Sequence, residues 1–318
     1  MPLPEDLPPT LYHYTDTGGL LGILGNPVAF PGTDEGTFAT EKDATFGTLW
    51  ATDARYLNDS QELTYGAEML AKKLETEADS ARSETVRERL HQLAADTRNG
   101  RFEYNTRSKV EKPNPHVTCF CTSGNLLSQW RGYGDGGGGY AIGFTGTAIA
   151  GLITVNASLF QTDPELSVGP VQQAVRVRYG KVEAEPFLTE CAGEARHGLE
   201  QIESGKKSYR WPDTFHGVIA TSLAQVKHDA FREESEWRVV VDQEWGGEDA
   251  QFRAGRVGLI PYQKLYFPIT KAGTPLVKEI VVGPGGEREL RKEALERLLA
   301  KIGSADTEVV LSDAPYRG

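Results

Sequence analysis

The chain has 318 residues, of which 39% are hydrophobic, so it is long enough for one large domain or two ordinary ones with a continuous core. Its 34 Lys and Arg residues against 45 Asp and Glu residues give a net charge of -11, which argues against a whole-molecule electrostatic surface for duplex nucleic acid. Three cysteines are too few for a disulfide framework. The N-terminal segment is neither basic nor apolar, and no later window approaches the ~20 apolar residues of a membrane span, so we expect a soluble, cytoplasmic protein.

The first elements expected along the chain are a strand at residues 11–15 and a helix at residues 18–24, which Asn26 and Pro27 end. A second strand is expected around Leu49 and Trp50. Residues 60–98 then form a long, charged helical region with sparse apolar positions. We therefore expect residues 60–112 to contain a solvated helical hairpin or insertion that packs along one side of the molecule.

The chain after residue 115 mixes strands and helices irregularly. Strands are expected at residues 116–121, 140–144, 174–180, 236–242, 264–268, 278–283 and 307–312, and helices near residues 126–130, 184–203, 215–228 and 287–302. Short strands whose connections are often not of helix length favour a mixed, largely antiparallel sheet over a doubly wound parallel one. The predicted fold class is therefore α+β with flanking helices, in a single domain over residues 1–318.

A glycine-rich stretch within residues 119–144 gives the strongest sign of a binding site. The four glycines at 136–139 cost backbone entropy and bury no side chain, which indicates a pocket where the main chain closely approaches another group. The residues before them offer a hydroxyl, an amide, a guanidinium and two rings that suit a planar, polar ligand: Ser128, Gln129, Trp130, Arg131 and Tyr133. The alternative is a strand connection with a glycine tip and no ligand.

The segment FREESEWRVVV, residues 231–241, is the candidate source of a carboxylate. On a strand, Glu234 and Glu236 alternate onto the same face. Two like charges so close raise at least one pKa unless Arg232, Arg238 or a ligand hydroxyl compensates them, and such pairs suit acid/base or hydroxyl-binding work. A solvated, salt-bridged edge strand is the competing interpretation.

Three other polar segments have simpler interpretations. His13 lies between two tyrosines on the first strand, where it is either catalytic or a hydrogen-bonded packing residue. Asn58 and Asp59 with Glu62 have the pattern of an Asx turn and a helix cap, so their predicted role is structural. The glycine-rich turn at residues 281–289 is also interpreted as structural. No HExxH or GxSxG motif and no paired Cys/His set occurs, so no metal site is predicted.

Several motifs follow one another along about residues 11–284: LYHYT, LWAT, YLNDSQE, CFCTS, NLLSQWRGYG, GYAIGF, EESEWR and EIVVGP. Their order resembles a bacterial family catalogued as domain of unknown function 2971. The layout is also similar to a remote version of the ADP-ribosyltransferase fold. In that fold an early strand carries His or Arg, a middle strand leads into a helix that bears Ser and Tyr, and a late strand carries the catalytic Glu.

The second resemblance implies roles for particular residues. His13 would hold the adenosine ribose of NAD, and Glu236, with Glu234 as its competitor, would bind the nicotinamide ribose and stabilise the oxocarbenium-like transition state. Ser128 with Tyr133 or Trp130 would hold and stack on nicotinamide. The segment Cys119 to Cys121 departs from the pattern, because a strand with a tyrosine is common there. The residues so assigned to NAD binding are Tyr14, Thr15, Ser128, Gln129, Trp130, Arg131 and Tyr133.

The resemblance therefore implies an NAD-dependent ADP-ribosyltransferase with NAD as its substrate. Its acceptor would be a protein or nucleic acid, as for a toxin or phage-defence effector with an antitoxin or defence partner, or water, as for an NAD glycohydrolase. One alternative is a non-catalytic nucleotide-sensing or protein-interaction domain. Another is a metal-independent nuclease that uses His13 and Glu236, against which the acidic charge balance argues.

Overall fold

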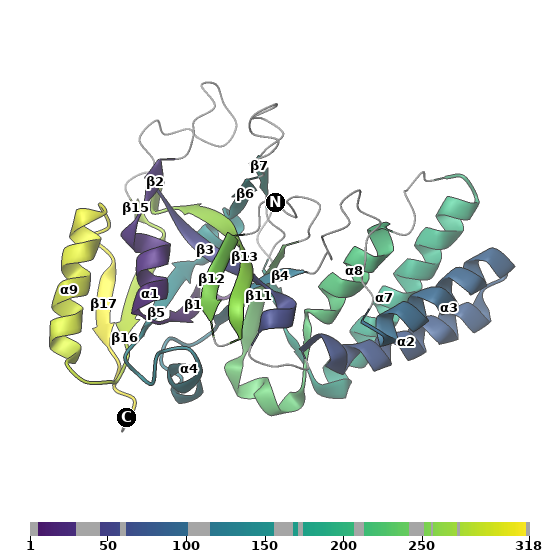
Figure 1. The fold of residues 1–318 in the computed structure, drawn as a ribbon, viewed down its shortest axis with the longest axis horizontal. Helices are drawn as coiled ribbons and strands as arrows, with labels where there is room; N and C mark the ends of the chain where they lie inside the picture. Colours follow the sequence, from purple (N-terminus) through teal and green to yellow (C-terminus); the bar gives the residue numbers. More distant parts are fainter. Residues whose placement is uncertain are drawn as a thin grey trace.

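The structure is a computed structural model. It describes residues 6–29, 45–57, 62–100, 115–155, 168–170, 174–206, 213–241, 251–255, 257–271 and 274–315. Figure 1 shows a central sheet with one helix along one side and a projecting arm of helices on the other. Among the described helices, none combines the length and apolar character that a membrane crossing needs.

The central sheet of the described chain has 13 strands, and most neighbours in it are antiparallel. They are β1 (Thr10–Thr15), β2 (Val28–Ala29), β3 (Thr45–Asp53), β4 (His116–Cys121), β5 (Tyr140–Thr145), β6 (Ile153–Val155), β7 (Val168–Pro170), β8 (Val175–Arg176), β11 (Glu236–Val241), β12 (Gln251–Gly255), β13 (Gly258–Pro268), β16 (Val277–Val282) and β17 (Glu308–Leu311). The main order is β17-β16-β5-β1-β4-β3-β13-β6-β7, with β11 beside β4 and β12 beside β13. Two small ribbons pair β9 (Arg178–Tyr179) with β10 (Val226–Lys227) and β14 (Thr270–Lys271) with β15 (Thr274–Pro275).

The helices lie around this sheet and in the arm. They are α1 (Thr17–Leu20) with its π-helical continuation η1 (Leu21–Gly25), α2 (Glu62–Ser80), α3 (Glu84–Arg98), α4 (Leu127–Gly132), α5 (Gly146–Ala150), α7 (Gly180–Glu203), α8 (Asp213–Leu223) and α9 (Arg288–Lys301), with 3-10 turns η2 (Ala54–Tyr56) and η3 (Asp229–Glu234). The predicted α+β class with a mixed, mostly antiparallel sheet and flanking helices is confirmed.

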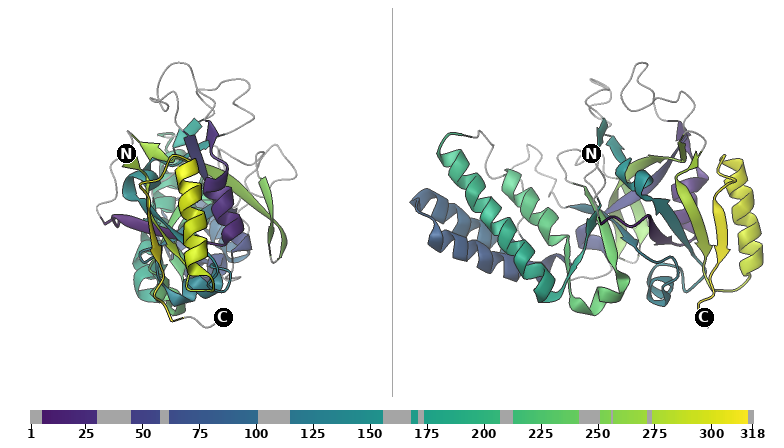
Figure 2. Two further views of the ribbon diagram at one scale, coloured as in Figure 1. Left: turned by 90° about the vertical axis from the view of Figure 1, so that its left-hand side faces the viewer. Right: turned by 180° about the vertical axis from the view of Figure 1, so that it is seen from behind.

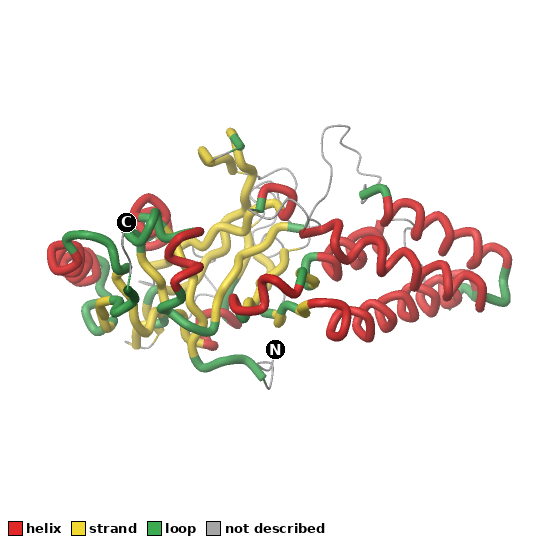
Figure 3. The backbone as a smooth tube through the Cα atoms, turned by 90° about the horizontal axis from the view of Figure 1, so that it is seen from below, coloured by secondary structure: helices red, strands yellow, loops and turns green. Residues whose placement is uncertain are grey.

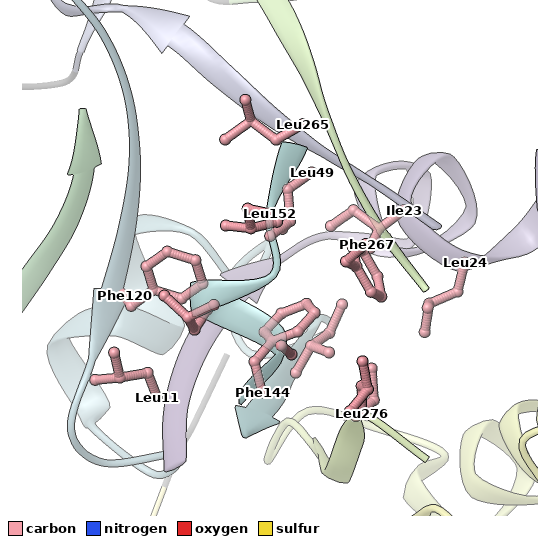
Figure 4. Packing of buried hydrophobic residues seen from close by; sticks show 14 of the residues in the cluster. Leu11, Ile23, Leu24, Leu49, Phe120, Phe144, Leu152, Leu265, Phe267 and Leu276 are labelled. Carbon is pink, nitrogen blue, oxygen red and sulfur yellow. The ribbon is translucent and has the colours of Figure 1, made fainter. Parts of the chain in front are cut away.

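The core of the sheet is apolar and rich in phenylalanine. Phe144 packs edge to face on Phe120 and on Phe267, with ring centroids 5.9 and 5.1 Å apart. Leu11 of β1 and Leu49 of β3 belong to the same buried cluster, which Figure 4 shows from close by. Because the cluster draws on β1, β3, β4, β5 and β13, it fixes these strands relative to one another.

The arm has a second core of its own. Helices α2 and α3 pack against α7 and α8 through buried side chains that include Leu70, Leu90, Leu188 and Leu223. Figures 2 and 3 show these helices side by side and projecting from the sheet. The sequence led us to expect a solvated helical hairpin or insertion in this region. Ser83 caps a second helix after a break, as in a hairpin, but α2 and α3 each bury an apolar stripe. Residues 58–61 and 101–114, including the expected turn at Asn58 and Asp59, lie outside the described residues.

Candidate functional site

The sheet forks beside β4. One edge of β4 is paired along its length with β11, from Glu236 opposite Cys121 to Val241 opposite His116. The other edge meets β1 at the pair Tyr12 and Cys121, and meets β3 only four residues away, at Val117 and His116. Strands β1 and β3 therefore leave β4 at its two ends, and residues 118–120 lie within the fork.

A cavity of about 570 Å³ occupies this fork. Its walls come from the end of β1 and the start of α1, from β3 and β4, from α4, from the segment containing Glu234 and Glu236, and from the β12–β13 hairpin. The volume lies within the range of small-molecule sites, which is roughly 300 to 1,000 Å³. In the described part of the chain, no group of three or more His, Cys, Asp or Glu side chains could hold a metal ion.

Most residues that the sequence assigned to a site meet at this cavity. Those that line it are His13, Tyr14, Thr15, Gln129, Tyr133, Glu234 and Glu236. They come from a strand near the start of the chain, a short helix in its middle and a late turn and strand. Ser128, Trp130 and Arg131 do not line it.

The prediction that Trp130 stacks on a ligand is wrong. Its side chain is 0% exposed, its Nε1 donates to Asn125 Oδ1 at 2.9 Å, and its ring packs edge to face on Tyr14 at 4.8 Å. Helical periodicity explains the difference, because Gln129 and Tyr133, four residues apart at the end of α4, share one face while the side chains of Trp130 and Arg131 point elsewhere. For the same reason the binding roles predicted for the half-buried Ser128 and the exposed Arg131 have no support at this cavity.

The glycines at 136–139 approach other main chain, not a cavity. The amide of Gly283 donates to the carbonyl of Gly139 at 2.9 Å, and that of Gly285 donates to Gly137 at 2.8 Å. A Cβ atom on Gly139 would lie 2.3 Å from the carbonyl oxygen of Thr15. The close approach was predicted correctly, but the pocket was not, because two glycine loops pack on each other and hold α4 against the end of β1. Arg291 binds the second loop by donating to the carbonyl of Gly283 at 2.7 Å.

His13 is held as a neutral ring at the cavity wall. Its Nδ1 donates to the carbonyl of Cys119 at 2.9 Å, which assigns the acceptor role to Nε2 in the neutral tautomer. The ring also packs edge to face on Phe120 at 5.9 Å. Burial lowers the pKa of His13, so the imidazole is uncharged at neutral pH and offers one hydrogen-bond acceptor.

The two glutamates do not share a strand, contrary to the prediction. Glu234 ends the 3-10 turn η3, Ser235 is left-handed with φ of 44°, and the strand begins only at Glu236. The left-handed residue redirects the chain, yet both carboxylates reach the same cation. Lys227 Nζ lies 2.7 Å from Glu234 Oε2 and 3.0 Å from Glu236 Oε2.

Glu236 is buried and fully ionised. Arg238 Nε donates to its Oε1 at 2.8 Å and Arg238 Nη2 to its Oε2 at 3.1 Å, a two-point pairing. Burial by itself would raise the pKa of Glu236, but the charges of Arg238 and Lys227 outweigh burial and lower the pKa to about 2. Arg238 thus supplies the compensation that the sequence suggested, whereas Arg232 pairs with Glu183 and Asp229.

The two tyrosines that the sequence assigned to the site differ in how far their hydroxyls are already hydrogen-bonded. The hydroxyl of Tyr14 donates to the carbonyl of Ser123 at 2.9 Å and accepts from the amide of Leu126 at 2.8 Å, so it holds the start of α4. Tyr133 lines the cavity with 42% of its surface exposed. Burial of its hydroxyl raises the pKa of Tyr133, so it remains a hydrogen-bond donor at neutral pH.

Three residues at the site were given no functional role from the sequence. Lys227 follows α8 and Arg253 lies on β12, and neither belongs to the motifs named above. Trp50 of β3 belongs to the LWAT motif and was placed on a strand without a functional role, but it lines the cavity and packs on Tyr262 at 4.9 Å. Pairing between strands that are distant in sequence brings all three residues to the site.

Comparisons with known proteins cover the middle of the chain. A family model described as "Protein of unknown function (DUF2971)" matches residues 129–239. No curated protein and no solved structure matches the chain. The matched segment runs from α4 to β11 and so contains Tyr133, Lys227 and Glu236. The family match therefore supports the DUF2971 part of the resemblance, over the segment that supplies the acidic wall of the cavity.

Proposed function

We propose that the protein binds NAD in this cavity and cleaves the bond between nicotinamide and ribose, as an ADP-ribosyltransferase-like enzyme. One observation carries the proposal: His13, Tyr133 and Glu236 come from three distant segments and line one cavity. A neutral ring acceptor, a phenol donor and an ionised carboxylate suit a ligand with ribose hydroxyls and an aromatic base.

The proposed chemistry uses the negative charge of Glu236. As the bond from ribose C1′ to the nicotinamide nitrogen breaks, its electron pair goes to that nitrogen and positive charge develops on the ribose. An ionised carboxylate beside the ribose stabilises that charge. The acceptor oxygen or nitrogen, from a macromolecule or water, then bonds to C1′ and loses its proton to solvent. Since the pKa of Glu236 is about 2, this carboxylate stabilises charge and does not donate a proton.

A second function has an observation in its favour. Both carboxylate oxygens of Glu236 are already bonded to Arg238 and Lys227, so its negative charge is largely balanced in the protein itself. A balanced carboxylate can bind hydroxyl groups but stabilises a developing cation less strongly. Under this alternative, the cavity binds a nucleotide without turnover, as a sensing module.

Release of nicotinamide from NAD tests the proposal. We expect the wild-type protein to release nicotinamide, measured by chromatography, and Glu236→Gln to be slower by at least ~100-fold, because the charge next to the ribose is lost. Glu88→Gln, the same substitution at an exposed position of α3, should leave the rate unchanged. Comparison of the rates of Glu234→Gln and Glu236→Gln shows which carboxylate contributes more to nicotinamide release.

Two further measurements complete this experiment. Thermal melting identifies a Glu236→Gln protein that does not fold, in which case His13→Asn replaces it, because asparagine can still donate to Cys119 while the ring Nε2 is lost. NAD binding by calorimetry separates the two functions. Binding without release supports the sensing module, and the absence of both binding and release contradicts both functions.

A further inference from the structure

The end of the cavity beside Trp50 and Thr52 carries the guanidinium of Arg253. Arg253 lines the cavity from β12, its Nη2 donates to Thr52 Oγ1 at 3.2 Å, and its guanidinium lies 6.0 Å from the centre of the Trp50 ring. No carboxylate of the described chain forms an ion pair with it. The nearby carboxylate of Asp16 accepts instead from the amide of Gly19 at 2.6 Å, as a helix cap.

Two buried hydrogen-bond donors at this end have no partner. Arg253 Nε and Trp50 Nε1 are buried and have no hydrogen-bond partner among the described residues, and both residues line the cavity. A buried polar atom without a partner is unfavourable, most of all in a charged group. Both atoms donate, so a bound group with several acceptor oxygens would satisfy them together.

The charge of Arg253 is not neutralised from the other end of the cavity. The two glutamates there are matched by Lys227 and Arg238, two carboxylates against two cations. Thr52 pairs with Val117 and Glu236 pairs with Cys121, so the two ends are anchored four residues apart on β4, about 13 Å at the rise of an extended strand. The cavity therefore has an acidic end whose charges are paired, and a basic end where Arg253 faces the carboxylate of Asp16 without forming an ion pair with it.

We propose that Arg253, with Trp50 and Thr52 beside it, forms an anion subsite that binds a phosphate or pyrophosphate group of the ligand. A planar guanidinium with free N–H groups suits phosphate oxygens, and its position over an indole limits its motion. The subsite stands on its own geometry. That its natural ligand is the pyrophosphate of NAD rests on the function proposed above.

Titration of inorganic pyrophosphate, followed by calorimetry, tests the subsite without any turnover. We expect pyrophosphate to bind the wild-type protein and to bind Arg253→Gln about 10- to 100-fold more weakly, as for loss of a charge-assisted hydrogen bond. Arg82→Gln is the matched control, because Arg82 is exposed between α2 and α3 and should not change binding. Equal binding by wild type and Arg253→Gln, or no binding by wild type, overturns the proposal.

Adenosine and ADP-ribose extend the test and separate it from the proposed function. ADP-ribose should weaken about as much as pyrophosphate in Arg253→Gln, whereas adenosine, which has no phosphate, should bind both proteins equally. If the protein binds pyrophosphate through Arg253 but releases no nicotinamide from NAD, the result supports the anion subsite and contradicts the proposed enzymatic activity. If NAD is turned over, Arg253→Gln should raise KM with little change in kcat, because the subsite lies at the far end from Glu236.

Discussion

At the scale of single residues, the site depends on a buried group of four charges. Glu236 and Arg238 are 3% and 0% exposed, and Lys227 joins Glu236 to Glu234. Such a group is stable only while it is complete, because the loss of one partner leaves another charge buried without compensation. Any substitution of Glu236 therefore tests folding as well as catalysis.

Removal of Arg238 should be strongly destabilising. We expect Arg238→Met to lower the free energy of unfolding by about 3–5 kcal/mol, since Glu236 is then left buried with Lys227 alone. Arg297→Met provides the comparison: Arg297 pairs with Glu293 on α9 with 78% of its side chain exposed, and its loss should cost at most about 1 kcal/mol. Urea unfolding of the two variants measures both values, and equal losses would show that the buried group is not important for stability.

His13 should make the stability of the folded protein depend on pH in the mildly acidic range. Because burial lowers the pKa of His13 from 6.5, the unfolded chain takes up this proton more readily than the folded protein. Its contribution to stability is complete above about pH 6.5 and is lost as the pH falls below that value. The wild-type melting temperature should therefore fall more between pH 7.5 and 5.5 than that of His13→Asn. If the two melting temperatures fall equally, the pKa of His13 is the same in the folded and the unfolded protein.

At the scale of elements, the position of α4 depends on the glycine turn that follows it. Gly139 touches the end of β1, whereas the nearest atom to a Cβ on Gly138 would be the carbonyl of Asp135 at 3.4 Å, an ordinary contact. The two neighbouring glycines thus have different spatial constraints. Through this turn, the backbone of β1 sets where Tyr133 faces the cavity.

Alanine at these two positions should give different results. Gly139→Ala forces backbone to move near Thr15, and we expect it to cost about 1–3 kcal/mol of stability and to weaken ligand binding. Gly138→Ala should be tolerated in both respects. Chemical denaturation and the NAD and pyrophosphate titrations test both variants. A Gly139→Ala protein with normal stability would contradict the packing described for the turn.

At the scale of the whole molecule, the sequence was a good guide to class and a partial guide to the site. Hydrophobic periodicity predicted the α+β class and most elements, and the polar residues His13, Tyr133 and Glu236 were correctly placed at one cavity. Trp130 was misread because its polar neighbours suggested a ligand, while the helix turns its ring into the core. Arg253 and Lys227 could not be found, because strands far apart in sequence place them: β13 pairs with β3 and carries the hairpin of Arg253, and β10 pairs with β9 beside Lys227.

The arm of helices joins the sheet at residues that form hydrogen bonds with Glu236 and Arg238. Tyr179, which precedes α7, accepts the amide hydrogen of Glu236 through its hydroxyl at 2.8 Å. Ala224, which follows α8, accepts from Arg238 at 2.7 Å, and Lys227 lies three residues further on. The base of the arm is thus hydrogen-bonded to Glu236 and to its partner Arg238. A ligand or partner that displaced α7 or α8 relative to the sheet would therefore change the hydrogen bonds of Glu236 and Arg238.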